Sequence, residues 1–457
     1  MKKKRKLKKW VYYLIILIIL IPLLFIVKNI SLKKDKNIED NNGEVKEDNK
    51  EIKYTDIIND ILEYDNSDYD EKFLNYIYDS YGIDSLNKLL DIVKDNKYDR
   101  NIWHEITNNS YIVLKDKYNK VYDNNDSVTV IDGNKDNVSI SFAGDISLAD
   151  NWEIMPYYKS RGKKIYGVLS EDLVKYMNDT DLMIINNEFS FSDRGTPLAN
   201  KKYTFRGTPS NVSIYNEIGV DMVTLANNHV YDYGENAFLD TLDTLKSAKM
   251  PYIGAGRNSD EAMKAYYFVI NGYKISFLNA SRAEKFILTP EATKTSPGVF
   301  RAYNPNPLAQ RIKEEKEKSD YVVALLHWGK EDSHELEDVI LKDGKLYVDS
   351  GADLVVGTHA HVLEGMEYYK DKLIAYNLGD FLFSHVSDYT GILTLNLSNS
   401  GDMSYKFIPA YQENFKTSYL TGSDATKLYD LMTKWSVNVK VDNNGNVVKF
   451  DKKWFLW

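Results

Sequence analysis

Four of the seven histidines in this chain directly follow short apolar runs. They are His229 after VTLANN, His327 after YVVALL, and His359 and His361 after DLVVGT. Asp145 and Glu188 repeat the pattern at the ends of VSISFAGD and DLMIINNE. Imidazole and carboxylate groups are ligands for Mn, Fe, Zn or Mg ions, and imidazole favours the transition metals. The residue types therefore predict a site for one or two divalent metal ions, whose identity they leave open.

A two-metal site needs a carboxylate that bridges the ions, with further ligands on both sides. Asp145 and Glu188 are the candidate bridging or terminal carboxylates. The other candidate ligands are His327, His359, His361 and the amide oxygen of Asn228. Two ions held in this way activate a water molecule near neutral pH and stabilise the attacking and leaving oxygens of a displaced centre. The predicted chemistry is hydrolysis or group transfer.

His229 adjoins Asn228 and could point inward as a general acid that protonates a leaving group. Asp232 and Asp353 are candidates to orient an imidazole ring through a hydrogen bond. Two histidines at i and i+2 after a buried strand, as in GTHAH, are difficult to explain by structural needs alone. We therefore predict a catalytic role for His229 and Asp232.

Buried strands are expected to position these residues. Each apolar run is short, rich in Val, Ile and Leu, and bounded by small or polar residues, which is typical of a strand buried on both faces. Ligands in α/β sheets gather beyond the carboxyl ends of the strands. Five strand ends that carry Asp, Glu, Asn and His therefore predict one convergent site.

Strand and helix patterns alternate from Val138 to about Phe407. Amphipathic segments such as GVLSEDLVKYMNDT and GENAFLDTLDTLKSAKM separate the apolar runs, and Asn271–Gly272 joins two strands as a hairpin turn. This alternation predicts an α/β fold with an at least partly parallel sheet.

Composition divides the chain into regions. Residues 29–50 are almost free of apolar side chains, which predicts a flexible linker, and helical spacing predicts a small helical pre-domain after it. The end of the chain resembles an appended hairpin that turns at residues 443–446. The expected regions are a basic tip (1–9), a transmembrane anchor (10–28), the linker (29–50), the pre-domain (51–125), the main domain (137–410) and a C-terminal extension (411–457).

The start of the chain has the pattern of a membrane anchor. Seven positive charges in residues 1–9 precede an uncharged run from Trp10 to Val27, which just spans a bilayer at about 1.5 Å per helical residue. A cleaved signal peptide is the alternative, but the apolar run is longer than a typical signal core and no small-residue cleavage pattern follows. The positive-inside rule then predicts a single-pass protein of the cell membrane, with a cytoplasmic tip and an extracytoplasmic main domain.

The net charge and the absence of cysteine argue against some classes of partner and exclude some kinds of site. The formal charge of −9 includes +7 from the first nine residues, so the remainder carries −16, which argues against nucleic acid as a partner. The chain has no cysteine, which excludes a thiolate zinc site and a lipid-modified cysteine anchor.

Eight segments occur in order between Ser139 and Phe383: FAGDISL, NNEFS, KKYTFRGTP, VDMVTLANNHVYDYG, PYIGAGRN, LLHWGKE, GADLVVGTHAHVLEGMEYY and IAYNLGDFLF. In this order they resemble the CapA family of poly-γ-glutamate capsule biosynthesis proteins, whose domain is similar to the calcineurin-like metallophosphoesterases. The resemblance covers over half of the chain. It implies a metallophosphoesterase-like α/β/β/α sandwich.

The metallophosphoesterase pattern, carried over by position, also implies a role for each candidate ligand. Asp145 and His361 would bind the first metal ion, and Glu188 stands where a bridging aspartate usually does. His229 would be the acid. The ligands implied for the second ion are Asn228, His327 and His359.

Three positions depart from the family pattern. The hydrolases have a histidine two residues after the first aspartate, where this chain has Ser147, which leaves open whether the first site is weak, completed by solvent or empty. Glu364 stands where CapA relatives commonly have Gln, and Asp380 where they commonly have Asn. Both add negative charge near the cleft, which would tune metal affinity or disfavour a polyanionic ligand.

Arg206 in TFRGTP and Arg282 in NASRAEK are candidates to bind a carboxylate or phosphate, because a guanidinium can do so through two hydrogen bonds. A structural salt bridge is the alternative for both. Asn187, beside Glu188, is a further candidate for substrate binding.

The resemblance implies a role in capsule polymer biosynthesis. One hypothesis is a metal-dependent hydrolase or transferase outside the membrane that acts on an anionic polymer, such as poly-γ-glutamate, or on a phosphoester. The alternative is a non-catalytic assembly or export component that binds the polymer and membrane synthase partners. A phosphodiesterase unrelated to capsule is a third hypothesis, because a fold does not determine a function.

Overall fold

The computed structural model of the chain describes residues 53–65, 67–123, 125–131, 135–162, 164–284, 288–384 and 386–450. The predicted basic tip, anchor and linker lie outside these residues. Within the part that is described, no helix combines the length and the apolar character that crossing a membrane requires. Residues from Tyr54 onward belong to one compact unit.

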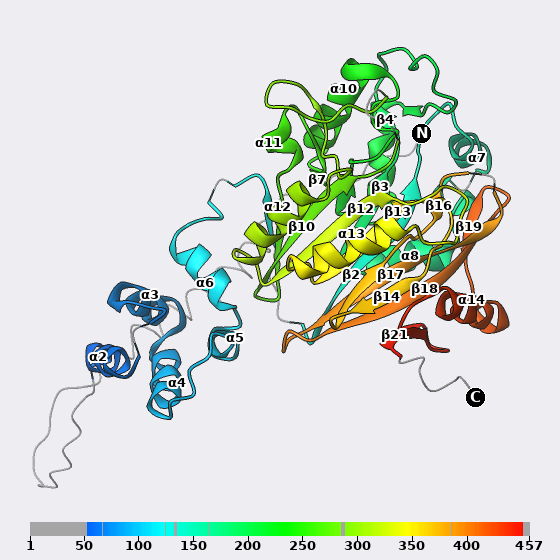
Figure 1. Cartoon of the computed structure of the whole chain (residues 1–457). Helices are drawn as coiled ribbons and strands as arrows, with labels where there is room; N and C mark the ends of the chain where they lie inside the picture. The colour runs from blue at the N-terminus through cyan, green and yellow to red at the C-terminus, as the bar shows by residue number, and fades with distance from the viewer. Residues whose placement is uncertain are drawn as a thin grey trace, which may run out of the picture. The chain divides into compact units, whose positions relative to one another are not determined.

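The helices that precede the sheets bury a small core of their own, and they run from blue to cyan in Figure 1. Asp70 and Ser110 cap two of them by accepting backbone N–H groups with their side-chain oxygens. The amphipathic helices turn side chains such as Phe73 and Leu89 towards Trp103 in this core. The helices are α2 (Tyr54–Tyr64), α3 (Glu71–Tyr81), α4 (Ile83–Lys94), α5 (Ile102–Thr107) and α6 (Tyr111–Tyr118).

A seven-stranded sheet has the order β1-β9-β10-β12-β13-β15-β14. Its central strands, from β10 to β15, are parallel, and Asn271–Gly272 joins β9 to β10 as the predicted hairpin turn, with both residues at positive φ. The strands are β1 (Val128–Ile131), β9 (Tyr266–Ile270), β10 (Tyr273–Ser281), β12 (Tyr321–Trp328), β13 (Leu354–His359), β14 (Met366–Tyr369) and β15 (Lys372–Ala375).

A ten-stranded sheet has the order β20-β21-β18-β17-β2-β3-β6-β7, and β16 and β19 pair with β2 and β18. The neighbours β2, β3, β6 and β7 are parallel, whereas β17 and β18 are antiparallel. The strands are β2 (Asn137–Ile146), β3 (Leu182–Asn187), β6 (Met222–Thr224), β7 (Tyr252–Ile253), β16 (Asp380–Leu382), β17 (Asp388–Ser398), β18 (Met403–Glu413), β19 (Lys416–Tyr419), β20 (Val439–Val441) and β21 (Asn446–Lys449).

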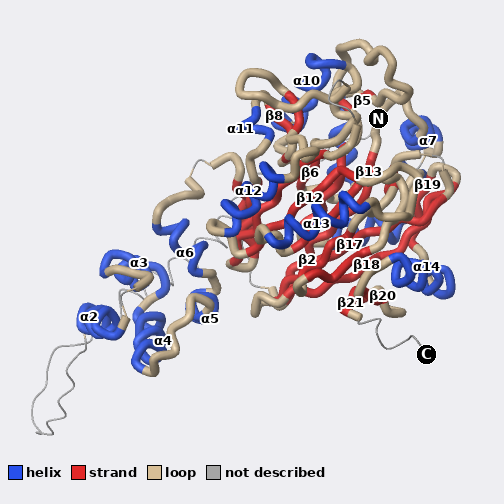
Figure 2. Tube along the Cα trace, in the orientation of Figure 1, coloured by secondary structure: helices blue, strands red, loops and turns tan. Residues whose placement is uncertain are grey.

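Both sheets are covered on each face, so the fold is a mixed α/β fold in layers, as the red strands between blue helices show in Figure 2. Phe142 of the larger sheet and Phe277 of the smaller one meet in a common apolar core. The outer face of the larger sheet packs on α7 (Ile154–Ser160), α8 (Glu171–Asp179), α9 (Ile214–Glu217) and α10 (Gly234–Ser247). The outer face of the smaller sheet packs on α11 (Ser259–Ala262), α12 (Asn306–Lys316) and α13 (Asp338–Asp349).

The C-terminal hairpin is more than an appendage. Strands β20 and β21 form a hairpin around residues 442–445, but β21 also pairs with β18 and so extends the larger sheet. The helix α14 (Gly422–Trp435), which the sequence analysis did not predict, buries Leu428 and Met432 against the core between the sheets. This packing closes one end of the sandwich.

The remaining short elements lie in the connections. They are η1 (Lys164–Gly167), η2 (Pro209–Ser213) and the two small ladders β4 (Ser190–Phe191) with β5 (Arg206–Gly207) and β8 (Ala255–Gly256) with β11 (Gly298–Val299). The β4–β5 ladder holds the loop after β3 against the start of the 206–213 segment, beside the predicted site.

Candidate metal centre

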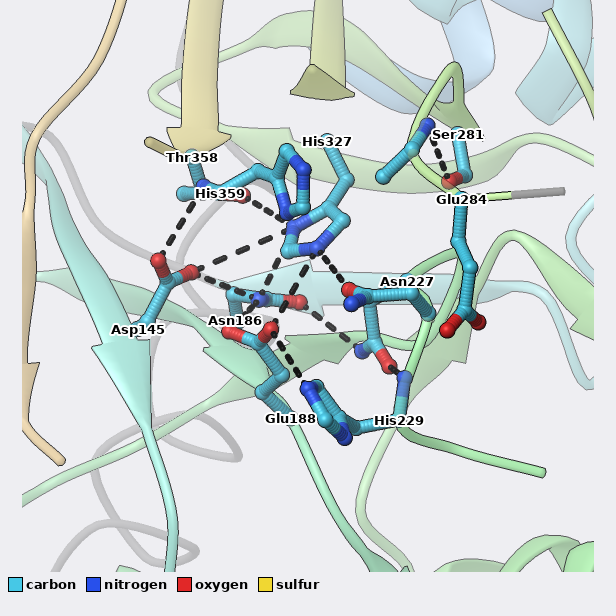
Figure 3. Close-up of polar contacts among 12 residues, drawn as sticks. Asp145, Asn186, Glu188, Asn227, His229, Ser281, Glu284, His327, Thr358 and His359 are labelled. Atoms are coloured by element: carbon cyan, nitrogen blue, oxygen red, sulfur yellow. Dashed lines mark hydrogen bonds and ion pairs between the residues drawn. The ribbon is translucent and has the colours of Figure 1, made fainter. Parts of the chain in front are cut away.

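The carboxyl ends of five strands bring the predicted ligands together, and Figure 3 shows Asp145, Glu188, His327 and His359 among them. Strands β2, β3 and β6 of the larger sheet and β12 and β13 of the smaller sheet all point their carboxyl ends to this edge. Asp145 and Glu188 are fully buried, and His361 is the most exposed of the clustered ligands, with 20% of its side chain accessible. Solvent therefore reaches the cluster on the His361 side.

Glu188 lies at the centre of the cluster. Its Oε1 is 3.4 Å from Nε2 of His327 and 4.0 Å from Nε2 of His229. Glu188 groups with Asp145 and His327 on one side, and with His359 and His361 on the other, and within each group the possible ligand atoms lie within 4.8 Å of one another. Asp145 and His361 each belong to two of the three groups of possible ligands among the described residues as well, so the cluster is one continuous set in which Glu188 is placed to serve as a bridging carboxylate.

The second ion's predicted ligands also meet. Nε2 of His327 is 2.7 Å from the amide oxygen of Asn228, and the rings of His327 and His359 are 4.6 Å apart between centroids. Nδ1 of His327 is 2.9 Å from the hydroxyl of Thr358, which orients the ring. His359 has a φ of 102°, a value that non-glycine residues rarely adopt, and such backbone strain concentrates at functional sites.

A register irregularity in β2 turns Asp145 into the site. Up to Phe142 the even-numbered side chains of β2 face the core between the sheets, but between Phe142 and Asp145 the pairing with β3 shifts. After this bulge Asp145 faces the cluster, while Ile146 joins the outer core. Gly144 permits the bend, because a Cβ there would lie 1.8 Å from the carbonyl oxygen of Gly379.

Two asparagines that the sequence analysis missed hold the carboxylates in place. Asn186 donates to Oδ1 of Asp145 at 2.7 Å and to Oε2 of Glu188 at 3.3 Å. The Asn186 amide oxygen accepts from Asn227, whose own oxygen accepts the backbone N–H of His229 at 3.0 Å. The signal was present in the sequence, since each is the first residue of an Asn-Asn pair ahead of a predicted site residue.

Asn187 does not face the cluster, which corrects its prediction as a substrate-binding residue. Alternate side chains of β3 point to opposite faces of the sheet, so Asn186 and Glu188 face the site and Asn187 faces the helices. Its amide donates to the carbonyl of Phe189 at 2.8 Å, and its oxygen accepts from the Tyr215 hydroxyl at 2.6 Å. Both ends of the fully buried side chain are therefore engaged within the protein.

His229 and Asp232 form a buried pair beside the cluster. Nδ1 of His229 is 2.7 Å from Oδ2 of Asp232, and the backbone N–H of Phe205 donates to the same oxygen at 2.7 Å. Burial raises the pKa of Asp232 to about 7, and burial together with the nearby Lys201 charge lowers the pKa of His229 well below its usual range. The neutral His229 ring then donates Nδ1–H to Asp232 and keeps Nε2 free on the side of Glu188.

Asp353 does not orient an imidazole, contrary to the prediction. It lies directly before β13, at the opposite end of that strand from His359. Its carboxylate accepts the N–H of Val322 at 2.9 Å and pairs with Lys316 and Lys372, each at 2.7 Å. The aspartate that contacts His361 is instead Asp380, whose Oδ1 is 2.7 Å from Nδ1 of that ring.

The two candidate arginines contact the protein rather than the cluster. Arg206 donates to the carbonyls of Arg194 and Gly195 at 2.9 Å and 3.2 Å. Arg282 donates to the carbonyl of Tyr303 at 3.0 Å and lies 3.9 Å from a carboxylate oxygen of Asp343. Substrate binding by Arg206 and Arg282 therefore stays a prediction.

The electrostatics of the cluster fit a divalent metal ion. Burial raises the pKa of Glu188 to about 8 and the pKa of Asp145 well above its usual range, while burial lowers the pKa of His327 to about 3. Among the described residues, Oε1 of Glu188 and Nδ1 of His359 are buried without a hydrogen-bond partner. Neutral imidazoles, an amide oxygen and two carboxylates that need a compensating cation are a suitable ligand set for Mn, Fe, Zn or Mg.

Lys201 contacts loop segments that surround this centre. Its Nζ is 2.7 Å from Asp232 and 3.0 Å from Glu284, and it also donates to the carbonyl of Asn228. We expect Lys201→Met to lower the free energy of unfolding by about 3 kcal/mol, because two carboxylates lose their buried partner. Lys274→Met is the matched control, since Lys274 is equally buried and pairs with Asp116 at 2.6 Å far from the cluster.

Both lysine variants should lose stability in thermal unfolding, but only Lys201→Met should also weaken metal binding, through Asn228. Equal metal affinity in the two variants would show that the Lys201 contacts do not position the ligands.

Glu364 is a buried carboxylate near the centre whose oxygens make no well-formed hydrogen bond within the described residues. Burial raises its pKa to about 8, so the folded state binds a proton that the unfolded state releases above about pH 4.5. The free energy of unfolding therefore falls as the pH rises from about 4.5 to 8, because the unfolded state releases the proton and the folded state keeps it. We expect Glu364→Gln to stabilise the protein by about 2 kcal/mol at pH 7.

The stabilisation by Glu364→Gln should vanish as the pH falls below about 4, where Glu364 is protonated in both states. Thermal unfolding of both proteins across this pH range measures the difference, and an equal gain at pH 4.5 and pH 8 would contradict the assignment.

Residues 139–385 match the family model described as "Bacterial capsule synthesis protein PGA_cap". This segment is more than half of the chain and contains every residue of the cluster. The chain therefore belongs to the PGA_cap family of bacterial capsule synthesis proteins.

Curated relatives agree with this membership. The chain is 31% identical over 244 residues to the capsule biosynthesis protein CapA of Bacillus anthracis, covering 52% of this chain and 59% of that protein. It is 33% identical over 186 residues to the PGA biosynthesis protein CapA of Bacillus subtilis strain 168, covering 40% and 48%. A probable polyglutamine synthesis accessory protein of Mycobacterium tuberculosis strain H37Rv is 27% identical over 222 residues, covering 47% and 57%.

The match is thus partial on both sides, since the chain spans 48–59% of the length of these relatives. Among solved structures, a 5'-nucleotidase from Candida albicans SC5314 aligns with 60% of this chain and 51% of its own, at 12% identity and a TM-score of 0.33.

Proposed function

We propose that the chain is a membrane-anchored, extracytoplasmic protein of poly-γ-glutamate capsule synthesis, with a metallophosphoesterase-like domain that acts as a metal-dependent hydrolase or transferase. The observation that carries the enzymatic part is the position of Glu188, which belongs to two ligand groups at once. Membership of the capsule synthesis family supports the process. The basic tip and apolar run at residues 1–28 support the anchor.

The residues divide into two candidate sites that share Glu188. By the family pattern, Asp145 and His361 would hold one ion, and Asn228, His327 and His359 would hold the other. The contact between His327 and Asn228 supports the second set, whereas the groups of neighbouring ligand atoms place Glu188 with Asp145 and His327, and with His359 and His361. Divalent ions bound there supply Lewis-acid activation of water and of the oxygens of a displaced ester or amide centre. Asn186 and Thr358 hold the two carboxylates and the ring of His327 in place, and all of these ligands except His361 are buried.

His229 is the proposed proton donor to the leaving group. Asp232 holds Nδ1, so Nε2 remains free on the side of the cluster, 4.0 Å from Glu188. An anionic substrate brings negative charge towards the ring and raises the pKa of His229, which favours the protonated form that can donate. Asp232 stabilises that charged form and fixes the orientation of the ring.

The proposed substrate is an anionic polymer such as poly-γ-glutamate, or a phosphoester. The chain outside its first nine residues carries −16, so attraction of a polyanion depends on bound cations and on local groups such as Arg206 and Arg282. Membrane synthase components are the proposed partners, and the anchor would keep the domain beside them.

The test uses the full-length chain in detergent, loaded with Mn²⁺ or Zn²⁺. We expect cleavage or transfer on poly-γ-glutamate or on a panel of phosphomonoesters and phosphodiesters, followed by the release of amine ends or of phosphate. The same chain and its His229→Ala variant are expressed in a capsule-forming strain that lacks its own copy. If the metal-loaded protein turns over neither substrate class and His229→Ala still restores the capsule, the enzymatic proposal fails and the assembly role is favoured.

A further inference from the structure

Asp380 brings a third acidic side chain to the candidate centre. Strand β16 lies parallel to β2, with Asp380 opposite Asp145 in register, and the side chain of Asp380 is 8% exposed. The close approach depends on Gly144, which faces the carbonyl of Gly379. Two strands far apart in the sequence therefore place their aspartates side by side.

The atoms of this corner are arranged as a ligand set. Nδ1 of His361 is 2.7 Å from Oδ1 of Asp380 and 3.8 Å from Oδ2 of Asp145, and one ligand atom from each of the three residues lies within 4.8 Å of the others. Ligand atoms around a tetrahedral ion with bonds of about 2 Å are about 3.3 Å apart. The three side chains need only small movements to surround an ion.

Ser147, two residues after Asp145, does not supply a strong metal ligand. Ser147 is fully buried, and its hydroxyl has no hydrogen-bond partner among the described residues. A neutral serine hydroxyl is a weak ligand compared with a carboxylate. Without Asp380, the protein ligands on this side would be Asp145, His361 and the shared Glu188.

We propose that Asp380 is a direct ligand of the ion held by Asp145 and His361, an inference that rests on the proposed function only in requiring that this ion binds. The hydrogen bond between Asp380 and Nδ1 of His361 keeps the two ligand atoms together in the metal-free protein, and its proton leaves when the ion binds. Ser384 donates to the other oxygen of Asp380 at 2.9 Å and fixes the carboxylate.

The two halves of the centre would then differ in metal preference. The Asp380 side offers the carboxylates of Asp145 and Asp380 and the imidazole of His361, and it would share Glu188 with the other side, which favours Mn²⁺ or Mg²⁺. The other side offers His327, His359 and the Asn228 amide beside Glu188, which favours Zn²⁺ or Fe²⁺. One chain would then bind two different ions, Mn²⁺ or Mg²⁺ on the Asp380 side and Zn²⁺ or Fe²⁺ on the His327 side.

The experiment measures Mn²⁺ binding to the full-length chain in detergent by calorimetry, with metal content counted by mass spectrometry. The variants are Asp380→Ala and the isosteric Asp380→Asn, and Glu364→Gln is the control for loss of a nearby buried carboxylate. We expect the wild-type chain and Glu364→Gln to bind Mn²⁺ equally, and both Asp380 variants to bind it at least about tenfold more weakly while keeping one Zn²⁺.

Asp380→Asn keeps an oxygen that accepts the Nδ1–H hydrogen bond and removes the negative charge, so it tests whether the carboxylate itself is needed. The position of the ion in a crystal structure then separates a direct ligand from a residue that only orients His361. Unchanged Mn²⁺ affinity in both Asp380→Ala and Asp380→Asn would overturn the inference while leaving the proposed function intact, whereas a wild-type chain that binds no ion would end both. A crystal structure of the Mn²⁺-loaded chain should place Asp380 within about 2.2 Å of the anomalous peak. An ion on Nε2 of His361, with Asp380 still on Nδ1, would contradict it.

Discussion

Glu188→Ala is expected to remove both metal binding and turnover, with a rate loss of at least about a thousandfold. Glu188 belongs to two of the three groups of possible ligands found among the described residues, so its removal weakens both proposed sites at once. Metal content by mass spectrometry and the rate on the substrate identified for the wild-type chain measure the effect.

Glu315→Ala is the matched control for Glu188→Ala. Glu315 is also fully buried, but it lies on α12 and pairs with Arg311 away from the centre. We expect Glu315→Ala to lose stability and to keep its metal content. Two bound ions and normal turnover in Glu188→Ala would show that the carboxylate does not bridge them.

His229→Ala is expected to lower kcat by about 10²–10⁴-fold at unchanged metal content. The residue faces the cluster through Nε2 but belongs to none of the three groups of possible ligands among the described residues, so the proton transfer is lost and the ions stay. Asp232→Asn should lower kcat in the same direction, because the Nδ1 hydrogen bond then no longer stabilises the charged ring.

The control for His229→Ala is His104→Ala. His104 is buried, its Nε2 is 2.8 Å from the carbonyl of Asn271, and its ring stacks on Tyr273 outside the centre. We expect a stability loss without a change in kcat. If His229→Ala loses its metal, the residue is a ligand and its assignment as the proton donor is wrong.

The residues at the carboxyl ends of the buried strands could be predicted from the sequence. Apolar runs identify buried strands, and parallel neighbours must bring their carboxyl ends to one edge, so the meeting of Asp145, Glu188 and His327 followed from local patterns. The hairpin at Asn271–Gly272 was likewise predicted from its turn residues.

Which face of the sheet a side chain occupies, and the register of the strand that carries it, could not be predicted from the sequence in the same way. Asn186 and Asn187 are adjacent and chemically identical, and only the alternation of β3 against its helices decides which of them reaches the site. The bulge before Asp145 lies where β16 pairs with β2, and β16 comes from a segment more than 200 residues later in the chain. Tertiary contacts of this range leave no local signal.

The contacts of the charged residues Lys201 and Asp353 could not be predicted from the sequence either. Lys201 lies in a loop without regular structure, and its role comes from three segments that meet only in the folded chain. Asp353 stands close to His359 in sequence but lies at the other end of β13, because a strand separates the two ends by about 3.3 Å per residue.

The metal content of the full-length chain, purified in detergent without added metal from a capsule-forming host, tests the central claim most directly. The account predicts one or two divalent ions per chain, with the loss of both in Glu188→Ala and retention in Glu315→Ala. A folded wild-type chain that holds no divalent ion, and gains none when Mn²⁺ or Zn²⁺ is supplied, would contradict it.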